Sequence, residues 1–141
     1  MANDGTARRL SLSDGSTSNN IFLSYRATAN QVRANISGSY DKTISISDTL
    51  LYSKLSIKYK SGDISFWVNG FEVDANTSSI SVSGLNTLNF DGGLGFQDFY
   101  GNVKCVAVFK EALDNDQLER LTGEGYETFN LLAQANNYTI I

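Results

Sequence analysis

The chain has 141 residues, of which 41% are apolar and 18% charged, a composition typical of one globular domain rather than a disordered chain. Its formal net charge of −4 argues against a nucleic-acid partner, because a phosphate backbone requires a basic face. The chain has no histidine and one cysteine, so histidine-based catalysis, histidine-ligated zinc and an intrachain disulfide are excluded.

The dominant period along the chain is two, which predicts half-buried β-strands. The first four predicted strands are Arg8–Ser13, Ile21–Tyr25, Val32–Ile36 and Ile44–Ile46. A fifth, residues 52–60, alternates most cleanly and places Lys54, Lys58 and Lys60 on a face that we expect to be solvated.

Two tight hairpins are predicted next, because Asn69-Gly70 is a strong type I′ turn signal and Ser61–Asp63 also reads as a turn. The strands of this region are Ile64–Asn69, Phe71–Asp74, Ile80–Ser83, Leu88–Asp91 and the long Gly101–Lys110. Alternation within the last strand predicts that Cys105 is buried.

The pattern becomes helical near the C-terminus. Leu113, Leu118 and Leu121 have helical spacing behind an N-capping Asp114, which predicts a helix over residues 114–122. A second short helix is predicted over Tyr126–Ala135, so the helical tail spans about 114–135, and the apolar Tyr138–Ile141 is predicted to close as a strand. We therefore expect one domain over residues 1–141, an antiparallel all-β sandwich or barrel with a helical tail.

Three segments in this order resemble the concanavalin A-like lectin/glucanase superfamily, close to its laminin-G-like branch. They are Leu10–Gly15, Leu55–Gly70 with its Val-Asn-Gly hairpin, and Phe99–Leu118 with its Ala-Leu and acidic turn. The resemblance covers about Leu10–Thr122 and implies a jelly-roll sandwich with one or two short C-terminal helices. The closing helix and the last six residues also resemble C-terminal modules of bacteriophage tail or fibre proteins. Sandwiches of this class host lectins, hydrolases and structural modules alike.

The same resemblance bears on partners, since such domains usually carry strands before the one that begins near Leu10. We therefore expect either that the chain is a fragment or that a sheet edge lies open there, and through that edge a homo-oligomer or docking to a larger protein. No apolar run reaches the roughly 18 residues that span a membrane, so we expect no membrane partner. Residues 1–13 lack the apolar stretch of a signal peptide, although the resemblance points to a virion or extracellular surface.

Sugar binding requires an aromatic platform beside hydrogen-bonding side chains. Trp67, the single tryptophan, shares a polar strand face with Asn69. It is either a groove floor or interface anchor, or a residue packed under a loop or the terminal helices. The loop 91–100 completes the candidate ligand-binding set with Phe96, Gln97, Asp98 and Tyr100. In the same loop we expect Phe99 to plug the end of the sandwich.

Catalysis of the glucanase type needs carboxylates at alternate strand positions, so that they project from one face toward one bond. Glu72 and Asp74 approach this spacing, but Asn76 occupies the third position. We therefore expect no catalytic residue and no enzyme activity.

Calcium is the one ion that the resemblance brings into consideration. Asp14, Asp91 and Asp98 lie near turns but lack the alternating spacing of a ligand loop, so we interpret them as turn residues. We expect no metal and no cofactor. The predicted function is a non-catalytic carbohydrate-binding or assembly module of a phage tail, fibre or surface protein. The alternatives are a glucanase-type glycoside hydrolase and a purely structural oligomerisation domain.

Overall fold

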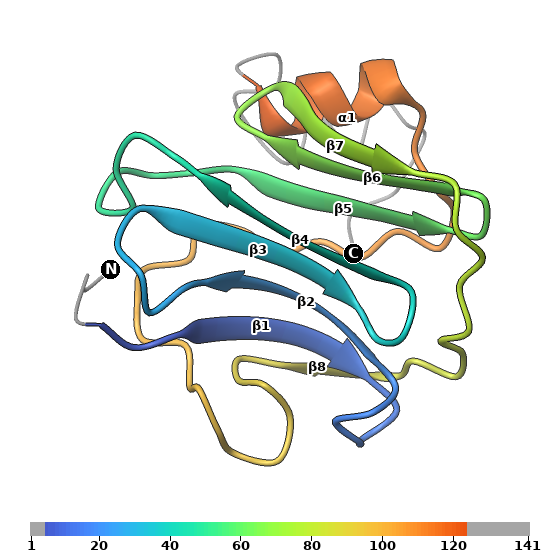
Figure 1. Ribbon diagram of the computed structural model, residues 1–141, viewed down its shortest axis with the longest axis horizontal. Helices are drawn as coiled ribbons and strands as arrows, with labels where there is room; N and C mark the ends of the chain where they lie inside the picture. The colour runs from blue at the N-terminus through green and yellow to red at the C-terminus, as the bar shows by residue number, and fades with distance from the viewer. Residues whose placement is uncertain (1–4, 124–141) are drawn as a thin grey trace.

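The computed structural model describes residues 5–123 and shows two antiparallel sheets packed face to face (Figure 1). The five-stranded sheet has the order β4-β3-β2-β1-β8, and the three-stranded sheet has the order β5-β6-β7. The strands are β1 Arg8–Ser13, β2 Asn20–Tyr25, β3 Gln31–Ile36, β4 Tyr40–Ser45, β5 Leu55–Lys60, β6 Asp63–Val68, β7 Phe71–Asn76 and β8 Thr87–Asn89. The mostly-β, antiparallel, two-sheet architecture is confirmed. The jelly-roll type stays a prediction, because sequential hairpins form both sheets except where β8 pairs with β1.

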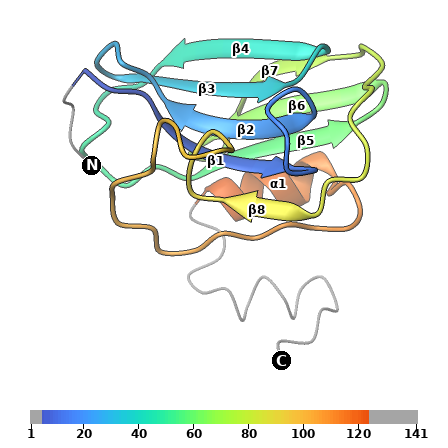
Figure 2. The same cartoon turned by 90° about the horizontal axis from the view of Figure 1, so that it is seen from below.

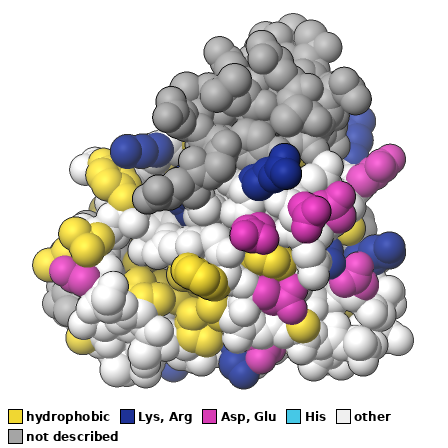
Figure 3. Space-filling model, turned by 90° about the horizontal axis from the view of Figure 1, so that it is seen from above, with side chains coloured by type: hydrophobic (Ala, Val, Ile, Leu, Met, Phe, Trp, Pro, Cys, Tyr) yellow, Lys and Arg dark blue, Asp and Glu magenta, His cyan; other side chains and the backbone are white. Residues whose placement is uncertain are grey.

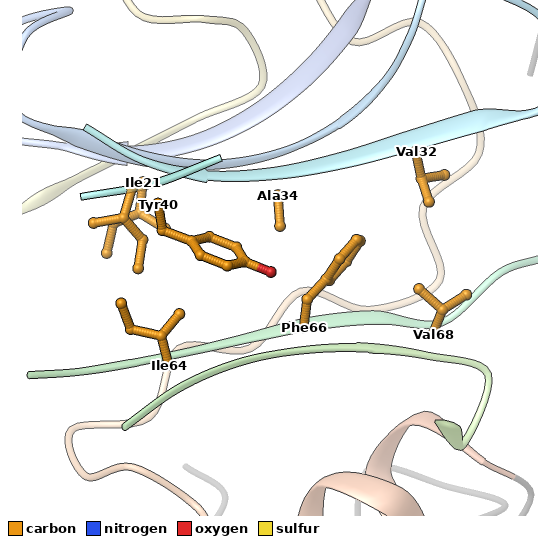
Figure 4. Close-up of a cluster of buried hydrophobic side chains, with 8 residues drawn as sticks. Ile21, Val32, Ala34, Tyr40, Ile64, Phe66 and Val68 are labelled. Carbon is orange, nitrogen blue, oxygen red and sulfur yellow. The ribbon is translucent and has the colours of Figure 1, made fainter. Parts of the chain in front are cut away.

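The core lies between the two sheets, where alternate residues of β2, β3 and β6 face one another (Figure 4). Val32, Ala34 and Phe66 are each 0% exposed. The tight turn after β6 has positive φ at both Asn69 (50°) and Gly70 (89°), as a type I′ hairpin requires. The alternation predicted for these core strands and the predicted hairpin turn are thus both present in the structure.

One helix, α1 (Asn115–Thr122), packs on the outer face of the three-stranded sheet (Figure 1). Its predicted N-cap is confirmed, since the Asp114 carboxylate accepts from Gln117 N at 2.8 Å. The Gln117 side chain in turn accepts from Asp114 N at 2.9 Å, which completes a capping box. The second predicted helix and the closing strand lie outside the described residues.

Replacing Asp114 with alanine is expected to lower the free energy of unfolding by about 1 kcal/mol, because the Gln117 amide group loses its acceptor. Asp114→Asn is the matched control, since its side-chain oxygen still accepts from the backbone. Urea unfolding followed by circular dichroism measures both variants. Equal unfolding midpoints for the wild type and Asp114→Ala would contradict the capping role.

Two strand predictions are wrong, because residues 80–83 and 101–110 have no strand pairing. No backbone hydrogen bond joins 101–110 to β5 among the described residues. Phe109 instead packs against the cluster of Trp67, Leu113 and Leu118 on the outer face of the three-stranded sheet. Cys105 is consequently exposed rather than buried.

Two other expectations about faces and edges also fail. The first strand is no edge, because β1 lies between β2 and β8. The lysine face of β5 is not fully solvated, because α1 covers part of it. Lys58 is only 8% exposed, and its Nζ lies 2.7 Å from Asp63 Oδ1 and donates to Asn115 Oδ1 at 3.0 Å.

Candidate functional site

The structure divides the six predicted ligand-binding residues between two distant elements. Trp67 is 5% exposed and packs against Leu113 and Leu118 under α1. Its indole N–H donates to Ser65 Oγ at 2.9 Å. The groove interpretation of Trp67 is therefore wrong and the packing alternative is confirmed, since α1 covers this polar-looking strand face.

Asn69 also has a structural role, within the β6–β7 turn. Its side-chain oxygen accepts from Lys54 N at 2.8 Å, and its own N–H donates to Lys54 O at 3.0 Å. These two bonds fasten the turn to the start of β5. Asn69 is thus close to Trp67 in the sequence, but the two side chains form no groove together.

The other four candidates lie together, in the loop that follows β8 and runs along β1 (Figure 2). Arg9 N donates to Gln97 O at 3.1 Å, and Arg8 Nη1 donates to Asp98 O at 3.3 Å. Two rings of this loop lie against the same two arginines, which project to opposite faces of β1 because they are consecutive strand residues. Arg8 Cζ is 4.9 Å from the Tyr100 ring centroid, and Arg9 Cζ is 5.4 Å from the Phe96 centroid.

Phe99, from the same loop, has the predicted plugging role. Its ring centroid lies 6.4 Å from that of Tyr25 and 6.3 Å from that of Phe90. Phe99 points toward the sandwich, while Phe96 is 39% exposed and Tyr100 is 64% exposed. The loop thus presents two rings to solvent and uses a third to anchor itself.

Three arginines converge on the outer face of the five-stranded sheet, which Figure 2 views directly. Ser24 of β2 pairs with Arg9 of β1 on one side and with Arg33 of β3 on the other. Arg26 follows two residues after Ser24, so alternation brings it to the same outer face. This convergence was missed from the sequence, although four of the five arginines lie within the first 33 residues.

Phe22 supports these arginines from below. Its ring is 5% exposed. The guanidinium carbons of Arg9 and Arg33 lie 4.1 Å and 5.2 Å from its centroid. Such cation–π contacts hold a guanidinium in a defined place at about 0.5–2 kcal/mol each. We call this surface, formed by Arg9, Arg26 and Arg33 with Phe22 and Phe96, the arginine face.

The arginines differ in whether a carboxylate neutralises them. Arg33 forms a two-point ion pair with Asp41, in which Nε donates to Oδ1 at 2.6 Å and Nη2 reaches Oδ2. By contrast, Arg9 Nε and Arg26 Nε are buried and have no hydrogen-bond acceptor among residues 5–123. Burial, followed by the charges of Arg33 and Arg26, lowers the pKa of Arg9. The Gln97 side-chain oxygen is a buried acceptor that likewise lacks a donor in the described chain.

The hydrogen bond from Arg33 lowers the pKa of Asp41 below its ordinary value. The ion pair between Arg33 and Asp41 therefore stabilises the fold above the unfolded-state aspartate pKa of about 3.9. This stabilisation is lost as pH falls through the lower Asp41 pKa of the folded state. Arg33→Gln is expected to raise the Asp41 pKa, as measured by NMR titration of its carboxyl carbon. The matched control Lys104→Gln, remote in sequence, should leave it in place. An unchanged Asp41 pKa in Arg33→Gln would contradict the ion pair.

The carboxylates considered for catalysis project from opposite faces of their sheet. The β6–β7 register shifts between Phe66 and Trp67, so that Trp67 pairs with Glu72 and Phe66 with Asp74. Val73 becomes the extra residue of a bulge, which reverses the alternation that the sequence indicated. Glu72 Oε2 accepts from Asn115 at 3.1 Å on the helix side, whereas Asp74 Oδ2 accepts from Tyr40 Oη at 3.0 Å on the core side.

Asp74→Ala is expected to lower the free energy of unfolding by about 1–2 kcal/mol, because Tyr40 loses a charged acceptor and Lys42 its ion pair. Glu72→Ala is the control and should change stability by less than about 0.5 kcal/mol, since Glu72 is exposed. Guanidinium unfolding curves measure both. A larger loss for Glu72→Ala would contradict the bulged register.

The turn aspartates bind their own loops. Asp14 accepts from Ser16 N at 2.9 Å and from the Asn19 side chain at 2.8 Å. Asp91 accepts from Gly93 N and Gly95 N at 2.5 Å and 3.2 Å. Within residues 5–123, no three potential metal-ligating side chains gather in one place. The described helix is too short to cross a membrane.

The opposite side of the molecule differs from the arginine face. Figure 3 shows that acidic and basic side chains lie interspersed on the side that bears β7 and α1. A cleft also opens between the inner face of β1 and the free edge of β5, but its lining includes Leu12, Leu23, Ile57 and Val106 and is largely apolar. The buried Nε atoms of Arg9 and Arg26, which have no acceptor among the described residues, lie instead on the side of the five-stranded sheet.

The fold and this face define a two-sheet β-protein with a cationic, aromatic-lined surface. No family model matches the chain, and no curated protein matches it either. A crystal structure of an S-layer domain-containing protein from Clostridium thermocellum aligns with a TM-score of 0.40 at 14% identity, over 79% of this chain and 60% of that one. The chain thus spans less than two thirds of that neighbour, and a likeness of this degree defines neither a shared fold nor a shared function.

Proposed function

We propose that the protein is a non-catalytic carbohydrate-binding module and that the arginine face is its ligand surface. The observation that carries this proposal is the meeting of the Arg9, Arg26 and Arg33 guanidinium groups with the exposed ring of Phe96 on the outer face of the five-stranded sheet. Saccharides stack their apolar C–H faces on aromatic rings while fixed polar groups bind their hydroxyls, and this face supplies both kinds of group.

The way this face is held also supports binding. Arg9 and Arg33 extend from hydrogen-bonded strands and rest on Phe22, so little side-chain freedom remains to be lost when a ligand binds. The loop that carries Phe96 is fastened to β1 through Ser11 Oγ, which donates to Asp91 O at 2.9 Å. A surface whose side chains are already ordered in the free protein binds a flexible sugar at lower entropic cost.

The glucanase-type alternative is disfavoured by the positions of the carboxylates. The two catalytic carboxyl groups of a glycosidase lie roughly 5–10 Å apart and flank one glycosidic bond. Glu72 and Asp74 project from opposite sheet faces and cannot flank the same bond. On the arginine face itself, the Asp41 carboxylate is bound by Arg33. A binding role without hydrolysis therefore fits the arrangement best.

We extend the proposal to the biological setting that the sequence resemblance implies. The module is a concanavalin A-like jelly roll in a phage tail, fibre or other surface protein, where it recognises glycan or contributes to assembly. Self-association or docking uses the free edges of β4, β5, β7 and β8, in place of the β1 edge first expected.

A glycan array with purified wild type and Phe96→Ala tests the binding proposal. We expect the wild type to bind a subset of glycans and Phe96→Ala to lose most of that signal. Asn69→Ala, from the other half of the predicted site, is the control and should bind as the wild type does. Absence of binding by the wild type, with an oligomer seen by light scattering, would favour the purely structural oligomerisation domain instead.

A further inference from the structure

The proposed function leaves the class of saccharide open, and the charges of the arginine face narrow it. We propose that this face takes an acidic saccharide and that Arg9 and Arg26 together bind its carboxylate. This inference rests on the proposed function, because it names the ligand class of the same surface.

The first argument is the balance of charge on the face. Three guanidinium groups lie on it, those of Arg9, Arg26 and Arg33, while the carboxylate in contact with them among the described residues is that of Asp41, bound by Arg33. The excess of positive charge stands against a whole-chain net charge of −4.

The second argument is the electrostatic cost of this arrangement in the free protein. Arg9 is partly buried beside the like charges of Arg33 and Arg26, which the single carboxylate of Asp41 offsets only in part, and Arg26 Nε is buried without an acceptor among the described residues. Partly desolvated like charges are unfavourable unless an anion lies between them. A carboxylate removes that repulsion and meets each planar guanidinium through paired N–H···O bonds.

The third argument separates a saccharide from other anions. The ring of Phe96 is exposed and its centroid lies 5.4 Å from Arg9 Cζ, so an aromatic surface stands beside the cationic groups. A uronic or sialic acid carries a carboxylate next to an apolar ring face and can contact both, whereas an inorganic anion has no apolar face to place on the ring.

The test is isothermal titration with an oligosaccharide that contains a uronic acid, with its carboxyl-reduced neutral counterpart, with a sulfated counterpart and with inorganic sulfate. The wild type should bind the uronate at least about tenfold more tightly than the neutral sugar, and the difference should shrink as salt rises. Arg9→Gln and Arg26→Gln should each lose about tenfold for the uronate and little for the neutral sugar. Lys60→Gln, which removes the same charge from an exposed position on β5, should bind as the wild type does.

The outcomes separate this inference from the proposed function. Equal affinity for the acidic and neutral sugars, unchanged by Arg9→Gln or Arg26→Gln, overturns the inference but leaves carbohydrate binding in place. Preference for the sulfated sugar overturns the assignment of a carboxylate. Binding of inorganic sulfate alone, or of no probe at all, overturns both proposals. Urea midpoints of the two arginine variants equal to that of the wild type show that both are folded.

Discussion

Replacing Phe66 with alanine is expected to lower the free energy of unfolding by about 3–5 kcal/mol, which is a large part of the stability of a domain this size. Phe66 is 0% exposed and lies in the middle of β6, where its ring fills the space between the two sheets opposite Ala34 (Figure 4). Small neighbours such as Ala34 cannot extend into the cavity, so the lost contacts are not replaced.

Urea unfolding followed by circular dichroism measures this loss. Phe71→Ala is the matched control, because Phe71 has the same side chain in the neighbouring strand but is 73% exposed. It should change stability by less than about 0.5 kcal/mol. Similar losses for the two variants would contradict the packing of the two sheets around Phe66.

Replacing Trp67 with alanine should also cost about 3–5 kcal/mol, because Trp67 is the residue on which α1 is seated. The side chain is 5% exposed and contacts Leu113 and Leu118. Its removal leaves a cavity between the three-stranded sheet and the helix, and it leaves Ser65 without its indole donor. We expect helical circular dichroism to decrease together with stability.

Trp67→Phe is the control, since it keeps most of the apolar contact and loses the hydrogen bond at about 1 kcal/mol. Fluorescence gives an independent reading, because the chain has one tryptophan. Emission of the wild type should be blue-shifted and protected from acrylamide, and it should shift little when sugar binds. A solvent-exposed emission that is quenched by sugar would restore Trp67 as the floor of a groove.

Alternation and turn chemistry predicted the fold well where local rules and tertiary packing agree. The Asn69-Gly70 hairpin and the Asp114 cap form as expected because backbone geometry and a local hydrogen bond decide them. The strand predicted over 101–110 does not form, because alternation predicts a strand face but not a pairing partner, and Phe109 packs toward the helix. A single bulge at Val73 was enough to separate Glu72 from Asp74, and no residue pattern announces it.

The candidate site was half predictable for a related reason. Phe96 and Tyr100 stood out because they lie beside Gln97 and Asp98 in one loop, whereas Trp67 stood out only because the covering helix is not visible from the strand pattern. The arginines escaped notice because each alone reads as a solvated strand residue. Their convergence depends on the β1-β2-β3 register, which sets Arg9 and Arg33 on either side of Ser24.

The central claim is that ligand binds at the arginine face, and mapping of backbone amide shifts by NMR tests it most directly. On titration with the uronate oligosaccharide, the largest shifts should cluster at Arg9, Arg26, Arg33, Phe96 and Gln97. The amides from Trp67 to Gly70 should stay in place, since they lie on the other sheet. Shifts concentrated at Trp67–Gly70, with the arginine amides unmoved, would contradict the assignment of the site.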